Sequence, residues 1–314
     1  MGDGNDRLRP NGAAAVLERA AEDTLLPFSL PGRNARGRVA RLGPALATIL
    51  GAHAYPAPLA RLLGEALVLT ALLGAMLRDD AGQLTLQVQA KGAVVDLIVC
   101  HWVSSERGGE LRGYLRHDAE RLSYLGKAPS LKALLGRGHL AITLDQTAVA
   151  ERYQGIVPLE GASLAEMAER YFAQSEQLPT LIRIAVDGAP ENPGAAGGLI
   201  VQHVPRGELG RERLSVADEH PDWAHVRALA STVKSEELLD AGLPLETLVW
   251  RLFNEDEVRA GAAVHIEQGC RCSEAHFTSV LARFPEDERA EMRGEDGTVT
   301  VDCAFCAQSF KVAV

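Results

Sequence analysis

Four of the five cysteines of this chain lie in its last 45 residues, as Cys270 and Cys272 in GCRCS and as Cys303 and Cys306 in VDCAFC. Thiolates bind soft or borderline metal ions, and oxidants attack the same groups. The two pairs have the spacing Cys-x-Cys and Cys-x-x-Cys, with 30 residues between them. Two tight turns would therefore supply four ligands, which predicts a tetrahedral zinc site with one zinc ion per chain.

The spacing also restricts the local backbone. Positions 270 and 272 diverge on a helix, so this pair must lie on a turn, which Gly269 permits. His265 and His276 are close enough in sequence to replace a thiol, but with four thiols present we expect both at the surface. Unrelated thiols or plain structural disulfides remain the alternative to the metal site.

No other group of residues suggests catalysis. We expect Cys100 to be an inert buried residue, and His101 and His117 to be isolated histidines. NPGAAGG at 192–198 lacks the strand–loop–helix context of a phosphate loop and is interpreted as a turn. A thioredoxin-like role for CAFC needs a following helix and strand, and only eight residues follow Cys306. The chain is therefore not expected to be an enzyme.

The composition is that of a globular protein with an acidic surface. The 314 residues are 46% hydrophobic and carry a formal net charge of −10, which argues against binding to nucleic acid or to anionic membranes. No secretory signal is visible, and the apolar run at 62–77 is short and contains Glu65, so a buried helix is expected there. We therefore expect a cytoplasmic protein, where clustered cysteines are metal ligands or redox groups.

The periodicity predicts an α+β protein in four parts. Residues 1–30 are a polar, mobile leader, and residues 31–211 form a mixed core domain. Residues 212–264 form a helical linker with apolar stripes, and residues 265–314 form a small four-cysteine zinc domain with one helix and a strand, TVTVDC. The linker stripes must pack against a neighbour, because short helices are marginal alone.

Within the core, residues 39–78 are predicted to be helical, with breaks at Pro44, Pro56 and Pro58. SLAE at 163–166 has the pattern of a capping box at a helix start. Alternation of apolar and polar residues predicts strands at 84–89, 93–102, 111–115, 140–144, 181–186 and 197–204.

Several motifs resemble those of one family, the redox-regulated heat-shock chaperones of about 33 kDa, which are bacterial ATP-independent holdases. A holdase binds unfolding proteins and prevents their aggregation without turnover. The motifs are YPAPLARLLGEALVLTALL at 55–73, YQGIVPLEG at 153–161, YFAQSEQLPT at 171–180, GGLIVQHVP at 197–205, LVWRLFNEDEVR at 248–259 and the cysteine pattern itself.

The resemblance implies a reduced, inactive state in which Cys270, Cys272, Cys303 and Cys306 bind zinc. It further implies that oxidation forms the disulfides Cys270–Cys272 and Cys303–Cys306, that zinc leaves and that the terminal domain unfolds. The linker would then expose its apolar faces to client proteins, and the chain would form a homodimer. Such a small module depends on its metal for folding, since zinc contributes about 10–16 kcal/mol in comparable sites.

The chain departs from the family at Ala307, where members commonly have a glycine, which leaves the turn after Cys306 open. Two other functions also remain open. One is a zinc-ribbon module that binds nucleic acid or a protein partner, although residues 265–314 carry five basic and nine acidic side chains, a net charge of −4. The other is a thiol oxidoreductase that uses CAFC.

Overall fold

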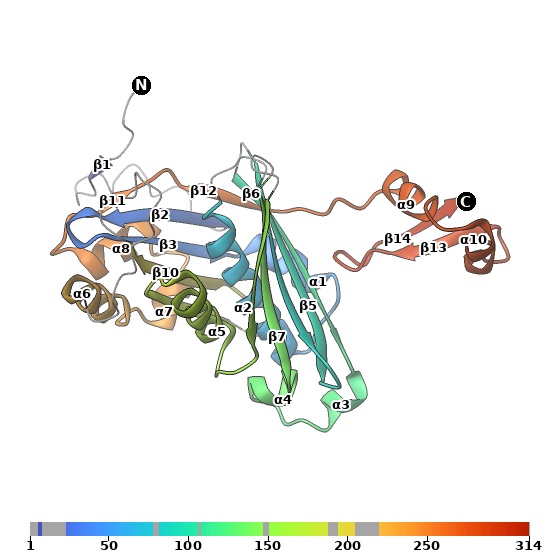
Figure 1. Ribbon diagram of the computed structural model, residues 1–314, viewed down its shortest axis with the longest axis horizontal. Coiled ribbons are helices and arrows are strands. Elements are labelled where there is room, and N and C mark those ends of the chain that lie inside the picture. Colours follow the sequence, from blue (N-terminus) through green and yellow to red (C-terminus); the bar gives the residue numbers. More distant parts are fainter. Residues whose placement is uncertain are drawn as a thin grey trace.

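The computed structural model places most of the chain in one long, bent sheet with helices on both sides (Figure 1). Much of the predicted leader and the start of the predicted linker fall outside the described residues. The structure describes residues 6–7, 23–77, 82–105, 108–146, 151–187, 194–204 and 220–313.

Two groups of strands form the sheet, and one strand joins them. The order along the sheet is β8 (Glu151–Pro158), β7 (Gly138–Gln146), β4 (Gln83–Ala90), β5 (Val95–Ser105), β6 (Gly108–His117), β12 (Val264–Gln268), β2 (Thr24–Leu30), β3 (Ala35–Leu42), β10 (Ala196–His203) and β9 (Thr180–Val186). The first five strands form one group, the last four form the other, and β12 joins them. Among these described pairings only β12–β6 is parallel. The short strands β1 (Asp6–Arg7) and β11 (Arg259–Ala260) pair with each other, and β11 also pairs with β2.

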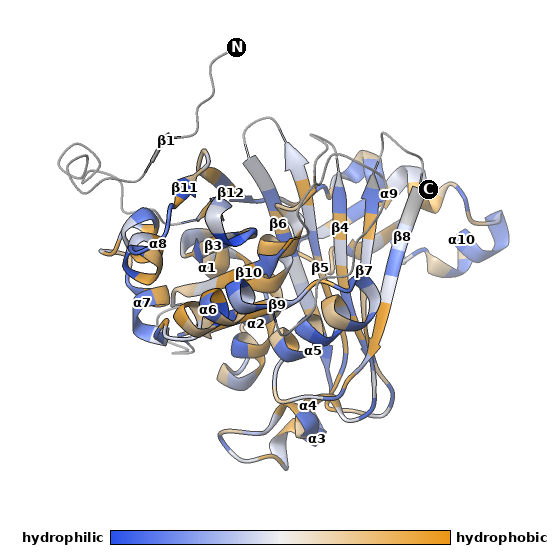
Figure 2. Cartoon of the chain, turned by 60° about the vertical axis from the view of Figure 1, so that its left-hand side comes forward, coloured by the Kyte–Doolittle hydropathy of each residue, from blue (hydrophilic) through white to orange (hydrophobic). Residues whose placement is uncertain are grey.

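The strands predicted from alternation are confirmed, with boundaries that differ by a few residues. Figure 2 shows the banding of hydrophilic and hydrophobic residues along β4, β5 and β7 that the alternation produces. On β6 the same alternation buries Leu111, Gly113 and Leu115 and leaves the residues between them partly exposed. One face of this group of strands is therefore packed, and the other is open to solvent.

Two boundaries drawn from sequence need correction. Residues 24–30, placed in the leader, form β2 near the middle of the sheet, and residues 39–42, predicted as helical, belong to β3. Residues 39–42 are too few for local periodicity to distinguish a strand from a helix. For both segments, the long-range pairing of β2 with β3 determines the strand structure. Residues 264–268 likewise join the sheet as β12 although they span the predicted boundary between linker and terminal domain.

Proline residues begin the core helices, as expected. α1 (Pro44–Gly51) has Pro44 in its first turn, and α2 (Ala57–Gly74) follows Pro56 at its N-cap. By length and composition alone α2 could cross a membrane, but 72% of this 18-residue helix is buried inside the protein. It packs against strands from both groups, among them β5, β6 and β10, and is the central helix of the core.

The remaining core helices are short. α3 (Ala119–Ser123) and α4 (Leu131–Leu135) lie in the connection between β6 and β7, and α5 (Leu164–Tyr171) continues into a π-helical turn, Phe172–Glu176. The predicted capping box at the start of α5 is present in modified form. Ser163 Oγ accepts from the Glu166 amide, while the Glu166 carboxylate accepts from the Ala162 amide rather than from that of Ser163.

The linker folds as three helices, α6 (Pro221–Ala230), α7 (Ser235–Leu239) and α8 (Leu245–Phe253). Their apolar stripes are buried, as predicted, against the face of β2, β3, β9 and β10 that α2 does not cover. All eight residues of β10 are buried as a result, because helices cover that strand on both faces.

The chain then passes through β12 to a terminal module that projects from the opposite end of the molecule (Figure 1). The module contains α9 (Glu274–Leu281), α10 (Glu286–Met292) and the hairpin β13 (Thr298–Asp302)–β14 (Ser309–Ala313). Its fully packed core consists of only Leu281, Val299 and Val312. So small a core supplies little stability of its own.

Candidate metal centre

Two turns of different origin hold the four cysteines. The first follows β12 directly, where the Gly269 amide donates to the Leu111 carbonyl oxygen of β6 at 3.1 Å and so places Cys270 at the end of the sheet. The second is the loop of the β13–β14 hairpin, closed by the Cys303 amide, which donates to the Gln308 carbonyl oxygen at 2.9 Å. Both turns match the sequence prediction, and CAFC begins no helix.

The four sulfur atoms converge. Cys270 Sγ lies 3.2 Å from Cys272 Sγ and 3.6 Å from Cys303 Sγ, and Cys272 Sγ lies 3.4 Å from Cys306 Sγ. All four lie within 4.8 Å of one another, and none forms a disulfide. A tetrahedral metal ion with bonds of about 2.3 Å to sulfur requires sulfurs about 3.8 Å apart, so the cluster can hold one metal ion.

The predicted substitute ligands stay outside this cluster. Of the residues that the structure describes, only the four cysteines form the group, and neither His265 nor His276 belongs to it. His276 is exposed on α9, and the His265 side chain is 56% exposed beside Glu267.

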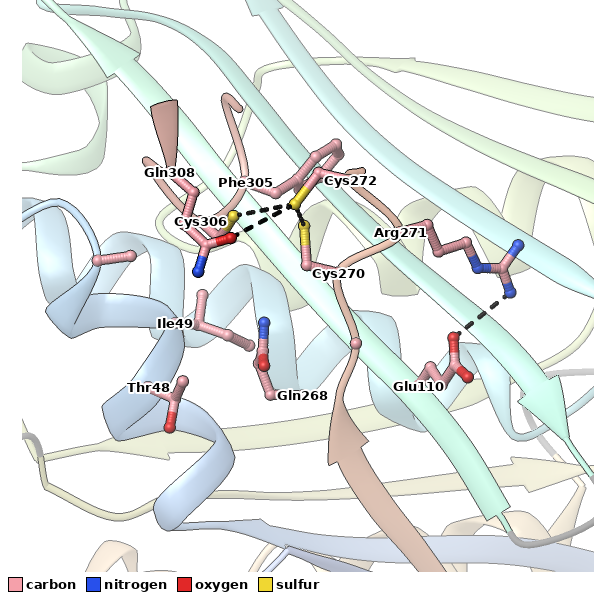
Figure 3. Close-up of a pocket in the computed structure, with 12 residues that line it drawn as sticks. Thr48, Ile49, Glu110, Gln268, Cys270, Arg271, Cys272, Phe305, Cys306 and Gln308 are labelled. Atoms are coloured by element: carbon pink, nitrogen blue, oxygen red, sulfur yellow. Dashed lines mark hydrogen bonds and ion pairs between the residues drawn. The ribbon is translucent and has the colours of Figure 1, made fainter. Parts of the chain in front are cut away.

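One side of the cluster is open. A cavity of about 700 Å³ between the module and α1 reaches Cys270, Cys272 and Cys306 (Figure 3). The fourth cysteine, Cys303, is only 6% exposed. Burial raises the pKa of Cys270, but hydrogen bonds from the Cys272 amide and the neighbouring thiols outweigh this and lower that pKa to about 7. Burial raises the pKa of Cys272 and of Cys306. The thiols therefore stabilise one thiolate among them, and small solutes can reach three of the four sulfurs.

The turn after Cys306 adopts the conformation for which glycine is suited. Ala307 has φ of 56°, in the left-handed region, and its amide donates to the Cys303 carbonyl oxygen at 2.8 Å. An L-residue with a Cβ pays an energetic penalty there of about 1–2 kcal/mol. Ala307 thus adopts a left-handed turn conformation and adds local strain to the loop.

The module contacts the core through side chains of both turns. Arg271 Nη2 lies 3.4 Å from Glu110 Oε2 on β6, an exposed ion pair (Figure 3). Phe305, between the last two cysteines, packs on the outer face of β5 and β6. The cysteine cluster is therefore connected both to the joining strand β12 and to the exposed face of the sheet.

A second interface, between linker and sheet, is largely apolar but contains buried polar groups. Trp223, 2% exposed, and Phe253 pack with Phe28 of β2 in a hydrophobic cluster separate from the one around α2. Arg41 of β3, 1% exposed, donates to three backbone carbonyl oxygens of the linker. His203 of β10, 2% exposed, packs against the rings of His220 and Trp223, and neither of its ring nitrogens has a hydrogen-bond partner among the residues that the structure describes.

An ion-pair group closes the same interface at its edge. Arg33 bridges Asp222 of α6 at 3.1 Å and Asp256, just after α8, at 2.7 Å. His225 Nε2 lies 2.8 Å from the second carboxylate oxygen of Asp256. Although burial raises it, hydrogen bonds from Arg33 and His225 keep the pKa of Asp256 below its ordinary value. The linker helices are therefore attached to the sheet by both apolar and charged contacts.

The residues expected to be inert are accounted for. Cys100 is 0% exposed, and burial raises the pKa of its thiol to about 12, so it is unreactive. His117 lies edge-on to Tyr55, whereas His101 contacts Arg112 and Phe305 and is thus less isolated than predicted. Part of NPGAAGG lies outside the described residues.

Arg41 and Phe305 were not singled out from sequence. Phe305 is visible inside the CAFC motif, but only the tertiary structure shows what it contacts. No signal in the sequence marks Arg41 as buried, because an arginine in a strand is ordinarily solvated.

Comparisons with known proteins agree with the geometry. The profile of the family described as "Hsp33 protein" matches residues 23–313. The "33 kDa chaperonin" of Caulobacter vibrioides is 41% identical over 297 residues, covering 93% of this chain and 95% of that protein. The "33 kDa chaperonin" of Ectopseudomonas mendocina is 38% identical and covers 90% of each chain. The crystal structure of the 33 kDa chaperonin from Thermotoga maritima superposes with a TM-score of 0.74 over 93% of this chain and 95% of that one, at 22% identity.

Proposed function

Because the chain belongs to the Hsp33 family of molecular chaperones, we propose that it is a holdase whose client-binding surface is controlled by its four terminal thiols. The chain is a chaperone and not an enzyme, and its partners are unfolded proteins. The observation that carries the proposal is the division of one hydrophobic cluster between the sheet and the linker, with a cluster of four cysteines just beyond the C-terminal end of the linker.

In the reduced state, Cys270, Cys272, Cys303 and Cys306 would hold one zinc ion as four thiolates. Three points support this assignment. Four sulfurs converge, and the group that the structure describes contains no oxygen ligand. Zinc also prefers tetrahedral sites built from thiolates. When bound, zinc would supply much of the folding free energy of a module whose own core is only three fully buried residues.

An oxidant converts each pair to a disulfide. Peroxide takes two electrons from a pair of thiolates and two protons from the solvent, and is reduced to two molecules of water, while the two sulfurs form the disulfide. Pairing within each turn, as Cys270–Cys272 and Cys303–Cys306, leaves the two turns unlinked, whereas pairing between the turns would tie them together. The proposed function requires the two turns to separate when the module unfolds, so it supports pairing within each turn.

Loss of the module's fold would act on the linker through β12. This strand ends two residues before Cys270, and its parallel ladder with β6 runs from His265 to Gln268. It also pairs with β2 through Val264 and His265. β12 is the only strand between the two groups along the described sheet path, so its detachment would weaken the attachment of the linker to the sheet.

Release of the linker would uncover a large apolar surface without dismantling the core. The sheet would expose Leu26, Phe28 and Val39 among others, and the linker would expose Trp223 and Phe253. The cluster around α2 has no member from α6, α7 or α8, so it can persist while the other is opened. Exposed apolar area of this kind binds unfolding clients.

The division of the chain into a core, a linker and a redox module is part of the same proposal. We place these parts at residues 23–204, 220–263 and 269–313, with β12 as the connection between the last two. The exposed surfaces would also support formation of a homodimer on activation. We further propose a cytoplasmic location, where reduced thiols persist, with no role for nucleic acid or membranes.

The experiment that tests this function measures zinc release and client aggregation together. Peroxide is added at mild heat to the reduced, zinc-loaded protein with a zinc indicator, and the product is tested by light scattering against a thermally unfolding client. One equivalent of zinc should be released before aggregation is suppressed. A Cys303→Ser, Cys306→Ser protein should retain no zinc and escape control by oxidant, whereas Cys100→Ser should behave as wild type. Suppression by the fully reduced, zinc-loaded wild type would contradict the proposal.

A further inference from the structure

The loop between the last two cysteines inserts an aromatic ring into a site on the core sheet. Phe305 is not a thiol ligand, and its side chain projects from the loop onto β5 and β6 (Figure 3). Its ring centroid lies 5.2 Å from that of His101 and 5.0 Å from that of Tyr114, with the Tyr114 ring edge-on at 85°. The Arg112 guanidinium carbon lies 4.2 Å from the same centroid.

Strand pairing brings these three side chains together on one face. His101 of β5 is directly opposite Arg112 of β6, and Tyr114 follows two residues later on the same face. We call His101, Arg112 and Tyr114 the aromatic cradle. Arg112 Nη2 lies 3.1 Å from His101 Nδ1, which orients the guanidinium plane over the ring of Phe305. The cradle belongs wholly to the core sheet, so it persists when the terminal module leaves.

The chemistry of the cradle selects an aromatic ring over an aliphatic side chain. A guanidinium over a ring face and a tyrosine edge against it both use the charge distribution of a π-system, which leucine lacks. Burial, with the nearby charges of Arg112 and Arg271, lowers the pKa of His101 to about 4, so the imidazole is uncharged at neutral pH. A neutral ring beside Arg112 avoids repulsion and offers a further stacking surface.

We propose that the aromatic cradle is a client-binding site for phenylalanine and other aromatic side chains of unfolded proteins, and that Phe305 fills it in the reduced state. The inference rests on the proposed function in that oxidation of the flanking cysteines withdraws Phe305. Phe305, a residue of the same chain, occupies the cradle in this structure, which indicates that the cradle accepts a phenylalanine ring. The site is distinct from the apolar surface under the linker, since it lies on the outer face of β5 and β6.

The experiment uses two labelled, unstructured peptides of equal length and charge, one with three phenylalanines and one with three leucines in their place. Binding to the full-length protein is followed by fluorescence anisotropy. Oxidised wild type should bind the phenylalanine peptide more tightly than the leucine peptide. Arg112→Ala and Tyr114→Ala should each weaken that binding about threefold to tenfold and leave the leucine peptide unchanged. Arg116→Ala is the matched control, on the same strand and face but paired with Asp96, and should have no effect.

A second variant tests the occupancy of the cradle without oxidation. Phe305→Ala keeps all four thiols and leaves the linker in place, so the reduced, zinc-loaded variant should bind the phenylalanine peptide through the cradle alone, while reduced wild type does not. Equal effects of Arg112→Ala and Arg116→Ala, or failure of reduced Phe305→Ala to bind, would overturn the inference. Failure of the proposed function would differ from both, since oxidised wild type would then suppress no aggregation.

Discussion

Arg41 on β3 donates from Nη1 to the carbonyl oxygen of Leu243 in the linker at 2.9 Å, although the two residues lie 202 positions apart in the chain. The same guanidinium donates to the carbonyl oxygens of Leu238 at 3.1 Å and Glu237 at 3.2 Å. Burial lowers the pKa of Arg41, and the charge of Asp240 opposes that shift. The sheet therefore holds the linker by a buried cation that is matched to backbone oxygens of one short segment.

Replacement of Arg41 by methionine should loosen the linker while leaving the metal centre intact. The variant keeps apolar bulk but leaves three carbonyl oxygens without their donor, which we expect to lower the free energy of unfolding by about 2–4 kcal/mol. Urea unfolding measures this loss, and light scattering should show partial holdase activity in the reduced, zinc-loaded protein. Arg137→Met, at an exposed position, is the control. A reduced Arg41→Met protein as stable and as silent as the control would show that this cation does not hold the linker.

The attachment of the linker should weaken as the pH falls below about 6.5. Burial and the neighbouring His220 lower the pKa of His203 in the folded state, while Asp222 opposes the shift. The unfolded state therefore binds the proton more readily than the folded state. The contribution of the uncharged His203 to the free energy of unfolding is fully present above the unfolded pKa of about 6.5 and is lost as the pH falls below that value. Between pH 7.5 and 5.5 the urea midpoint of wild type should fall further than that of His203→Leu.

The exposed His276→Leu variant is the control for this pH series. It shares any general effect of pH on zinc binding, so its urea midpoint should follow that of wild type. The same pH dependence in His203→Leu as in wild type would remove His203 from the explanation.

Gly108 is required where β6 meets β12. It has φ of 144°, and a Cβ built on it would lie 2.0 Å from the His265 carbonyl oxygen. Gly108→Ala should therefore displace β12 and cost about 1–3 kcal/mol. Hydrogen exchange would detect faster exchange of the amides of residues 265–269. Gly126→Ala, where no atom lies within 4 Å of the added Cβ, should leave these amides protected. Equal exchange in the two variants would contradict the role assigned to β12.

Ala307→Gly should tighten zinc binding. Removal of the Cβ at a φ of 56° relieves about 1 kcal/mol of strain in the loop that carries Cys303 and Cys306, equivalent to about fivefold in affinity. Competition with a zinc chelator measures the change. Ala304→Gly in the same loop is the control, because Ala304 has no positive φ and glycine there only adds flexibility. Weaker zinc binding by Ala307→Gly than by wild type would exclude strain at this position.

Mild oxidation should consume four of the five thiols. Cys100 is 0% exposed with a pKa raised to about 12, whereas the other four meet at the cluster. Thiol titration under denaturing conditions should therefore fall from five groups to one, and peptide mapping should identify the remaining thiol as Cys100. The mapped disulfides should be Cys270–Cys272 and Cys303–Cys306. Disulfides between the two turns would contradict this prediction, because they would hold the two halves of the module together.

Much of the local structure and the whole cysteine cluster could be predicted from sequence. The spacing of Cys270, Cys272, Cys303 and Cys306 predicts their convergence because short turns leave the paired thiols few directions. Alternation predicts β4 through β7, and the stripes of α6 and α8 predict a buried face. These signals are local, since each depends on residues within a few positions of one another.

Only the tertiary structure decided which distant segments meet. It places residues 24–30 inside the sheet, inserts β12 between β6 and β2, and brings Arg41 to the linker and Phe305 to the cradle. The chain contains no local signal for these contacts, because a strand's partners and the environment of a single arginine or phenylalanine depend on long-range packing. The sequence alone determined that four thiols can meet as metal ligands or redox groups, and the long-range pairing of strands determined which surfaces lie beside them.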